Sequence, residues 1–219
     1  MSPNTRKANT KMLPLVTPIQ VPAQVEQLSD YGISRIQGRG NINLLNRKIA
    51  TFLTGGCNEL LEQAAKELTS GHKILGRQER EDRLLCAVED LFQPTITVIA
   101  TGLDYYHGRG WEKRKQQIIS RDGVIITCTQ NMRPPSRQAF TWRNQLIVAL
   151  SHMVILASQP HQRTGAQAIA KLALAKNRPV ILITPENQEL TSADHELLTR
   201  GAKLAHTPQE VNQLAEQFS

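Results

Sequence analysis

Short apolar runs rich in β-branched residues recur along the chain, and segments with helical spacing lie between them. The clear runs span residues 49–54, 95–100, 124–128, 153–158 and 179–184, and two weaker ones span residues 73–76 and 203–206. Several of these runs are almost wholly apolar, which is typical of strands that are covered on both faces of a parallel sheet. The pattern therefore predicts the strands of a mostly parallel sheet.

The segments between these runs carry apolar residues three and four positions apart, as the buried face of a helix requires. They span residues 58–70, 79–92, 111–120, 141–150, 165–176 and 193–200, and a last helix is expected to start at Thr207 with a capping box. The alternation predicts an α/β fold with a doubly wound, mostly parallel sheet and helices on both faces. Ligands of such sheets bind beyond the carboxyl ends of the strands.

The 219 residues are expected to form one domain, residues 35–219, after a proline-rich N-terminal arm, residues 1–34. The apolar runs are too short to cross a membrane, and the first residues lack the apolar core of a secretory signal. The cysteines are scattered without C-x-x-C spacing, and the histidines lack metal-ligand spacing. These features favour a cytoplasmic protein without a metal or cofactor.

The formal net charge of +7 is distributed unevenly. Residues 1–50 carry a net charge of +5, residues 51–104 carry −4, residues 105–143 carry +6, and the rest of the chain is neutral. Basic residues that are confined to particular segments indicate a face that binds a polyanion. A basic surface that serves only solubility is equally compatible with these values.

Two glycine-containing turns are candidates for binding a phosphate. Gly55 and Gly56 follow the first clear run and open a helix, and Thr164 and Gly165, preceded by Arg163, open a later helix. The free N–H groups at the start of a helix attract anions. Neither turn has the full G-x-G-x-x-G or G-x-x-x-x-G-K-[ST] spacing. A tight turn and an ordinary helix cap are therefore the alternative interpretations.

The second basic block, residues 105–143, interleaves cations with aromatic rings. The residues concerned are Tyr105, Tyr106, Arg109, Lys113, Arg133, Arg137, Phe140, Trp142 and Arg143. Arginine binds phosphates and aromatic rings stack on bases, so this pattern suits single-stranded nucleic acid. A surface loop with Phe140 and Trp142 as core anchors is the structural alternative. The sequence contains no recognisable set of catalytic residues, and no enzymatic activity is expected.

Six short motifs, in this order, resemble the DprA/Smf family of DNA-processing proteins over roughly residues 38–206. The most specific is F-T-W-R-N-Q-L-I at residues 140–147, which is similar to the F-P-x-R-N-R-I-I signature of that family. The others lie at residues 40–47, 102–104, 164–166, 177–180 and 197–202. The resemblance implies a Rossmann-like fold and a non-enzymatic protein that binds single-stranded DNA, forms a homodimer and loads a RecA-type recombinase.

The resemblance also implies roles for individual residues. It carries over Arg143 as a DNA contact, and Asn144, Thr164 and Gly165 as residues that shape the pocket. The phosphate-binding arginine of the family's G-S-R motif is Cys57 in this chain. The charge distribution offers four candidates to replace it, which are Arg39, Arg109, Lys113 and Arg137.

Two alternative functions stay open at this point. The superfamily indicated by the resemblance also contains nucleotide phosphoribohydrolases of the Lonely-Guy type and nucleotide sensors, so a nucleotide-binding module is the main alternative. The P-G-G-x-G-T-x-x-E signature of those hydrolases is absent from the chain. The other alternative is a scaffold that keeps the fold without binding nucleic acid, which the missing G-S-R arginine favours and the basic blocks oppose.

Overall fold

The computed structural model of the chain describes residues 17–18, 28–33, 35–53, 59–69, 71–77, 82–130, 132–158 and 165–218. Nine strands of this part form one sheet, in the order β1-β2-β6-β5-β4-β3-β7-β8-β9. Their bounds are β1 Thr17–Pro18, β2 Gln37–Gly40, β3 Ile49–Leu53, β4 Lys73–Arg77, β5 Ile96–Val98, β6 Val124–Thr127, β7 Met153–Ala157, β8 Val180–Ile183 and β9 Lys203–Ala205. The strands from β3 to β9 are parallel to their neighbours, whereas β1 and β2 add antiparallel pairs at one edge.

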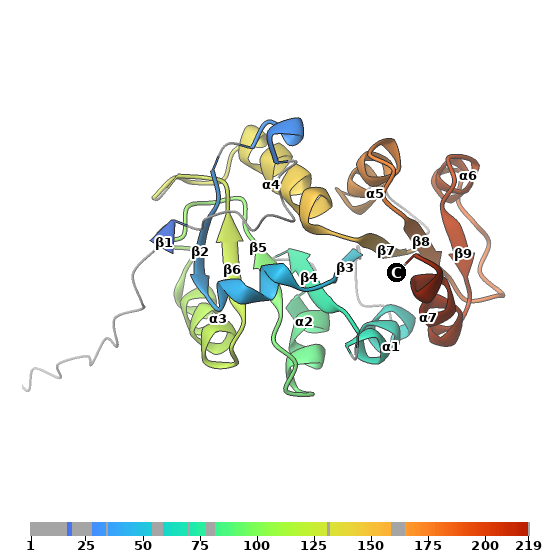
Figure 1. Ribbon diagram of the computed structural model, residues 1–219, viewed down its shortest axis with the longest axis horizontal. Coiled ribbons are helices and arrows are strands. Elements are labelled where there is room, and N and C mark those ends of the chain that lie inside the picture. Colours follow the sequence, from blue (N-terminus) through green and yellow to red (C-terminus); the bar gives the residue numbers. More distant parts are fainter. Residues whose placement is uncertain are drawn as a thin grey trace, which may run out of the picture.

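Helices cover both faces of this sheet (Figure 1). They are the 3₁₀ helices η2 Leu28–Tyr31 and η3 Ile42–Asn46, and the α-helices α1 Glu59–Leu68, α2 Asp82–Glu89, α3 Arg109–Ser120, α4 Arg137–Leu150, α5 Gly165–Ala175, α6 Ser192–Thr199 and α7 Pro208–Gln217. In Figure 1, α4, α5 and α6 lie above the sheet, and α1, α2, α3 and α7 lie below it. The predicted doubly wound α/β fold is confirmed.

The two faces of the sheet enclose separate apolar cores. On the upper side, residues such as Ile147 of α4 and Ile169 of α5 pack with one set of strand residues. On the lower side, Leu61 of α1 and Leu85 of α2 pack with the other set. Successive residues of a strand point to opposite faces, so an almost wholly apolar strand is what two covered faces require.

All seven predicted strands are present as β3 to β9, with ends that differ by a few residues. Two elements differ from the prediction in a way that matters for the site. Helix α4 begins at Arg137 rather than at residue 141, because the Ser136 hydroxyl accepts a hydrogen bond from the Ala139 N–H at 3.1 Å and caps it. Part of the predicted N-terminal arm packs on the body, since Leu28, Tyr31 and Ile33 are buried in the upper core.

The order of the strands fixes where a ligand can bind. Strand β3 lies between β4 on one side and β7 on the other, so the connections run outward in opposite directions from β3. This reversal is the topological switch point of a doubly wound sheet, and the crevice at its carboxyl edge is the usual ligand site. The loops that follow β5 and β6, and the first turns of α4 and α5, lie along that edge.

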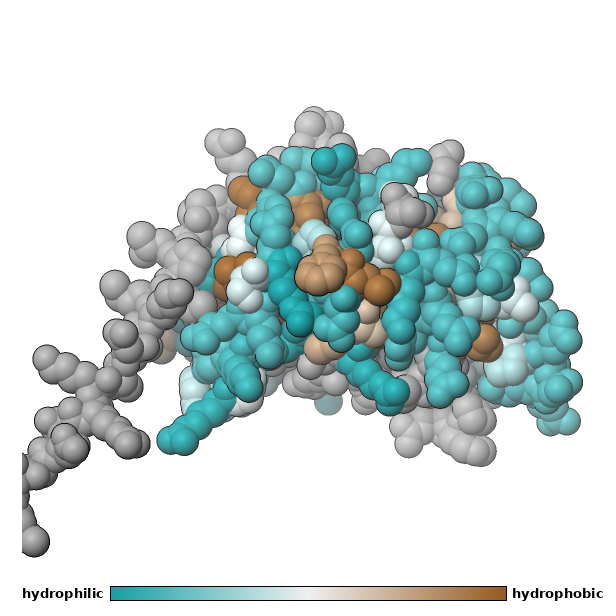
Figure 2. Space-filling model, turned by 90° about the horizontal axis from the view of Figure 1, so that it is seen from below, coloured by the Kyte–Doolittle hydropathy of each residue, from teal (hydrophilic) through white to brown (hydrophobic). Residues whose placement is uncertain are grey.

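The lower side of the molecule is mainly hydrophilic, with a small group of apolar residues near the centre of the view (Figure 2). Leu91 and Phe92, which directly follow α2, are among the exposed large hydrophobic residues. The helices on this side thus turn polar residues to solvent and apolar residues to the sheet. Within the part of the chain that the structure describes, no helix has the length and apolar character needed to span a membrane.

Candidate functional site

The first two turns of α4 bring together three of the predicted residues, which are Phe140, Arg143 and Asn144. Arg137, Phe140 and Asn144 follow the i, i+3, i+7 spacing of one helix face. The guanidinium carbon of Arg143 lies 4.9 Å from the centre of the Phe140 ring. The same guanidinium donates to Asn144 Oδ1 at 3.1 Å. Phe140 is 38 % exposed and is therefore a surface residue, not the core anchor that the structural alternative requires.

Other basic residues lie in the loop after β6 and in the first turns of α3 and α4. The loop after β5 joins the loop after β6 through a hydrogen bond from the Gly102 N–H to the Arg133 carbonyl oxygen at 3.0 Å. Arg109 and Lys113, in the first turns of α3, are exposed, as are Arg133 and Arg137. None of these four forms an ion pair with a carboxylate of the described residues. Their charges are directed to solvent.

Arg39 differs from the other arginines predicted to bind DNA. Its side chain is 6 % exposed, and its Nη2 lies 2.8 Å from Asp104 Oδ1. Strand β2 adds to the edge of β6 and buries Arg39 against the loop that follows β5. This ion pair gives Arg39 a part in holding the two segments together, so we leave it out of the binding surface considered below.

The predicted phosphate-binding turns are described only in part. Gly55, Gly56, Arg163 and Thr164 lie outside the described residues. Gly165 is exposed at the start of α5, which places it at the carboxyl edge as predicted. Gly165 itself therefore lies where a phosphate site is expected, and its binding role stays a prediction.

Arg77 is a residue at this edge that the sequence interpretation missed. It ends β4, is 3 % exposed, and its Nη1 lies 3.1 Å from the position that a Cβ on Gly165 would occupy. Arg77 thus reaches from β4, across the end of β3, to the first turn of α5. The available signal was an arginine directly after the weak run at residues 73–76, in the strand next to the switch point.

A cavity of about 230 Å³ lies on another side of α4. Its lining residues come from the segment after η2, from β2, from the end of β6 and from α4, and they are Gly32, Ile33, Arg35, Gln37, Cys128, Thr129, Gln130, Arg133 and Trp142. Burial raises the pKa of the Cys128 thiol to about 11, so this side chain is neutral near pH 7. Trp142 lines the cavity, and none of the lining residues that the structure describes is acidic.

Comparisons with known proteins bear on this site. The family model of DNA recombination-mediator protein A matches residues 87–217. DNA processing protein DprA of Streptococcus pneumoniae is 31 % identical over 118 residues, which are 53 % of this chain and 41 % of that protein. Protein Smf of Escherichia coli is 26 % identical over 118 residues, which are 53 % of this chain and 31 % of that protein. The chain thus matches less than half the length of either relative.

A solved structure has the same fold. DNA processing protein A from Helicobacter pylori, described for its single-stranded DNA binding mode, superimposes with a TM-score of 0.73 at 22 % identity, over 93 % of this chain and 97 % of that one. The family match spans more than half of this chain and includes α3, α4 and α5, but not β3 or β4. By that match, the chain belongs to the family of DNA recombination-mediator protein A.

Proposed function

We propose that this protein binds single-stranded DNA along the carboxyl edge of its sheet, without catalysing a reaction on it. The observation that carries the proposal is the arrangement on α4, where Arg143 lies over Phe140 and contacts Asn144. A cation beside an exposed ring can bind a phosphate while the ring stacks on a base. Membership of the family supports the proposal, as does the DNA binding described for the Helicobacter pylori relative.

The neighbouring arginines extend this surface. Arg133 and Arg137 are exposed just before and at the start of α4, and Arg109 begins α3. Arg77 supplies a buried positive charge beside Gly165. Phosphate contacts of this kind supply most of the affinity in sequence-independent binding. The proposed surface therefore runs from α3 over the first turns of α4 toward α5.

Three further parts of the proposal come from the family resemblance. They are a homodimer in solution, a RecA-type recombinase that is loaded onto the bound strand, and a place in the cytoplasm during DNA uptake and recombination. Each rests on the resemblance, since the geometry described above concerns a single chain. A nucleotide-binding module of the same superfamily stays the alternative prediction.

The test is binding of a fluorescein-labelled oligo-dT, followed by anisotropy at about 50 mM and about 200 mM salt. We expect binding at the lower concentration that weakens steeply at the higher one, because each phosphate contact releases counterions. Arg143→Ala is expected to weaken binding roughly tenfold or more, the effect of losing a hydrogen bond to a charged group.

The matched control is Arg200→Ala. Arg200 is 52 % exposed and follows α6, near the opposite edge of the sheet (Figure 1). Unchanged affinity is expected for this variant, because it removes the same charge at a distance from α4. No binding at low salt would overturn the proposed function. Equal losses for both variants would show that only net charge matters and would remove α4 from the proposal.

A further inference from the structure

We propose that the cavity between β2, the end of β6 and α4 is a nucleotide subsite, which takes one base against Trp142 and its phosphate on Arg35 and Arg133. A free nucleotide and one nucleotide of a DNA strand carry this same base and phosphate. The inference goes beyond the proposed function, because it assigns a second site, which shares Arg133 with the DNA surface proposed above and otherwise has different residues. It stands whether or not the Arg143 face binds DNA.

The cavity is separate from the Arg143 face because of helix geometry. Consecutive residues of an α-helix point about 100° apart. Trp142 and Arg143 therefore leave α4 in different directions, and Ala139 and Leu146, which lie between those directions, are buried in the core. Trp142 faces the side that carries Gln37 of β2 and Thr129 after β6. A ligand there would contact Trp142 rather than the Arg143–Phe140 pair.

Two buried polar atoms in the lining residues lack a partner. Gln37 Oε1 and Thr129 Oγ1 have no hydrogen-bond partner among the described residues. These side chains belong to residues that are 7 % and 3 % exposed. Leaving such groups unpaired is costly, and native structures seldom do so without a reason. Each of these two atoms has almost no exposed surface, so a donor of a bound base reaches it only when the side chain turns toward the cavity. Ring N–H and amino groups of a base are donors of the kind that the Gln37 oxygen then requires.

The charge and shape of the cavity narrow the class of ligand. Arg35 and Arg133 are exposed, and neither pairs with a carboxylate of the described residues. The described lining residues include these two cations and no acid, a charge that favours a phosphate. Ile33 and the neutral Cys128 thiol add apolar surface beside the indole of Trp142. A planar, partly polar ring joined to an anion satisfies all of these features.

The size of the cavity agrees with a single nucleotide unit. Its volume of about 230 Å³ lies below the ~300–1,000 Å³ of pockets for drug-sized ligands. A dinucleotide cofactor would not fit inside, but a base with its sugar would, leaving the phosphate at the mouth. Both exposed arginines can then reach that phosphate from the segments before β2 and after β6.

The test measures dTMP and dAMP binding by equilibrium dialysis and oligo-dT binding by anisotropy, for three variants. Trp142→Leu is expected to weaken mononucleotide binding roughly tenfold, the effect of losing one base–aromatic stack. Thr129→Val, which keeps the shape and removes the hydroxyl, is expected to weaken it about 3- to 10-fold. Thr97→Val is the control, because Thr97 Oγ1 is also buried without a partner among the described residues but does not line the cavity.

A structural role and a ligand role give different results for these valine variants. Both are expected to keep or raise the thermal unfolding midpoint, since each removes an unpaired buried hydroxyl. Only Thr129→Val is expected to lose nucleotide affinity. A further outcome is that oligo-dT binds and mononucleotides do not. If Trp142→Leu and Thr129→Val then weaken oligo-dT binding and Thr97→Val does not, the subsite accepts a nucleotide of the DNA strand.

Two outcomes would overturn the subsite. In the first, mononucleotides do not bind, and oligo-dT binding depends on Arg143 but is unchanged in Trp142→Leu and Thr129→Val. The proposed function then holds without the subsite. The second outcome is equal behaviour of Thr129→Val and Thr97→Val with every probe. Mononucleotide binding that Trp142→Leu abolishes, in a protein that ignores oligo-dT, would support the subsite and overturn the proposed DNA function instead.

Discussion

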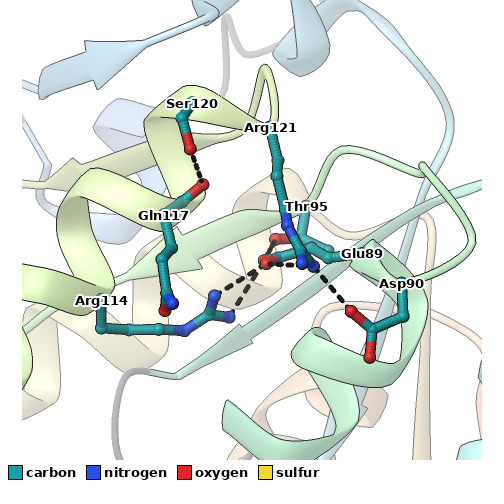
Figure 3. Close-up of polar contacts among 7 residues, drawn as sticks. All are labelled: Glu89, Asp90, Thr95, Arg114, Gln117, Ser120 and Arg121. Atoms are coloured by element: carbon teal, nitrogen blue, oxygen red, sulfur yellow. Dashed lines mark hydrogen bonds and ion pairs between the residues drawn. The ribbon is translucent and has the colours of Figure 1, made fainter.

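The arginines of one basic stretch, residues 105–143, fall into two groups with different surroundings. Arg114 and Arg121, on and just after α3, meet the buried carboxylate of Glu89 at the end of α2 (Figure 3). Arg133 and Arg137, beside α4, are exposed and form no ion pair with a described carboxylate. The first group is paired with acids, with Arg114 buried and Arg121 partly exposed, and the second group is exposed to solvent without such a pair among the described residues.

The Glu89 cluster has the contacts of a structural element. Glu89 is 2 % exposed, and it accepts hydrogen bonds from Thr95 Oγ1 at 2.6 Å and from two Arg114 nitrogens at 2.7 and 3.0 Å. Arg121 donates to Asp90 at 2.8 Å. Figure 3 shows these side chains converging from α2, α3 and the segment before β5. The cluster therefore joins three elements through one carboxylate.

The difference shows why net charge alone is a poor guide to a binding surface. Both groups add equally to the formal charge of +7. Glu89 lies in the acidic segment, residues 51–104, and its contacts neutralise a part of the basic block that follows it. The charge that remains for a polyanion is the part without such partners, and it lies around the start of α4.

The largest expected effect comes from removing the acid of the structural group. Glu89→Ala leaves the Arg114 guanidinium, whose side chain is 9 % exposed, without this carboxylate. Breaking a buried pair in this way costs about 3–5 kcal/mol, so the free energy of unfolding in urea is expected to fall by that amount. DNA affinity, measured well below the unfolding temperature, is expected to stay unchanged.

Arg121→Ala is the matched control for that variant. Its side chain is 45 % exposed, and exposed pairs contribute only about 0–1 kcal/mol. A loss of stability as large as that of Glu89→Ala would contradict the view that the buried Arg114 pair carries the cluster. A large loss of DNA affinity in Glu89→Ala would contradict the division of the arginines into two groups.

The second effect is on binding and concerns the other group. The double variant Arg133→Ala, Arg137→Ala is expected to weaken oligo-dT binding about tenfold. Its salt dependence is expected to become shallower by about 0.7 in log–log slope for each phosphate that the variant no longer binds. Stability is expected to stay within about 0.5 kcal/mol, as for most surface substitutions. A variant that unfolds more easily yet binds normally would reverse the roles assigned to the two groups.

The strands and helices could be predicted from the sequence because their signal is local. A strand such as β7, buried on both faces, must be apolar throughout. The interleaving of Phe140 and Arg143 could also be predicted, since the two residues lie within one turn of one helix. Helix α7 starts at Thr207 as predicted, although Glu210 accepts from the His206 N–H instead of closing the expected capping box.

The parts that escaped prediction depend on contacts between distant segments. Strand β2 reads Q-G-R-G and has no apolar period, because it is defined by its pairing with β6. Gly40 there has a φ of 108°, and a Cβ would collide with the Gly123 carbonyl oxygen. The ion pair of Arg39 with Asp104, and the position of Arg77 beside Gly165, likewise arise only when the chain has folded.

The smallest expected effect is a dependence of stability on pH that neither arginine group supplies. Arginine keeps its charge across the neutral range, whereas histidine has an ordinary pKa near 6.5, and two histidines lie just before β4 and β7. Burial and the nearby Lys48 lower the pKa of His72 below the ordinary 6.5. Burial, then Arg178 and Lys48, lower the pKa of His152, whose Nδ1 accepts from the Ile49 N–H at 3.1 Å.

Because both pKa values are lower in the folded state, the unfolded chain binds more protons below about pH 6.5. Stability is therefore complete above that pH and is lost as the pH falls toward the folded-state pKa values. Urea unfolding between about pH 7.5 and about pH 5.5 is expected to show a slope below the ~2.8 kcal/mol per pH unit of two full protons, at ~1.4 kcal/mol each. His72→Asn and His152→Asn are each expected to reduce the slope. An equal slope in all three proteins would show that other groups set the pH dependence.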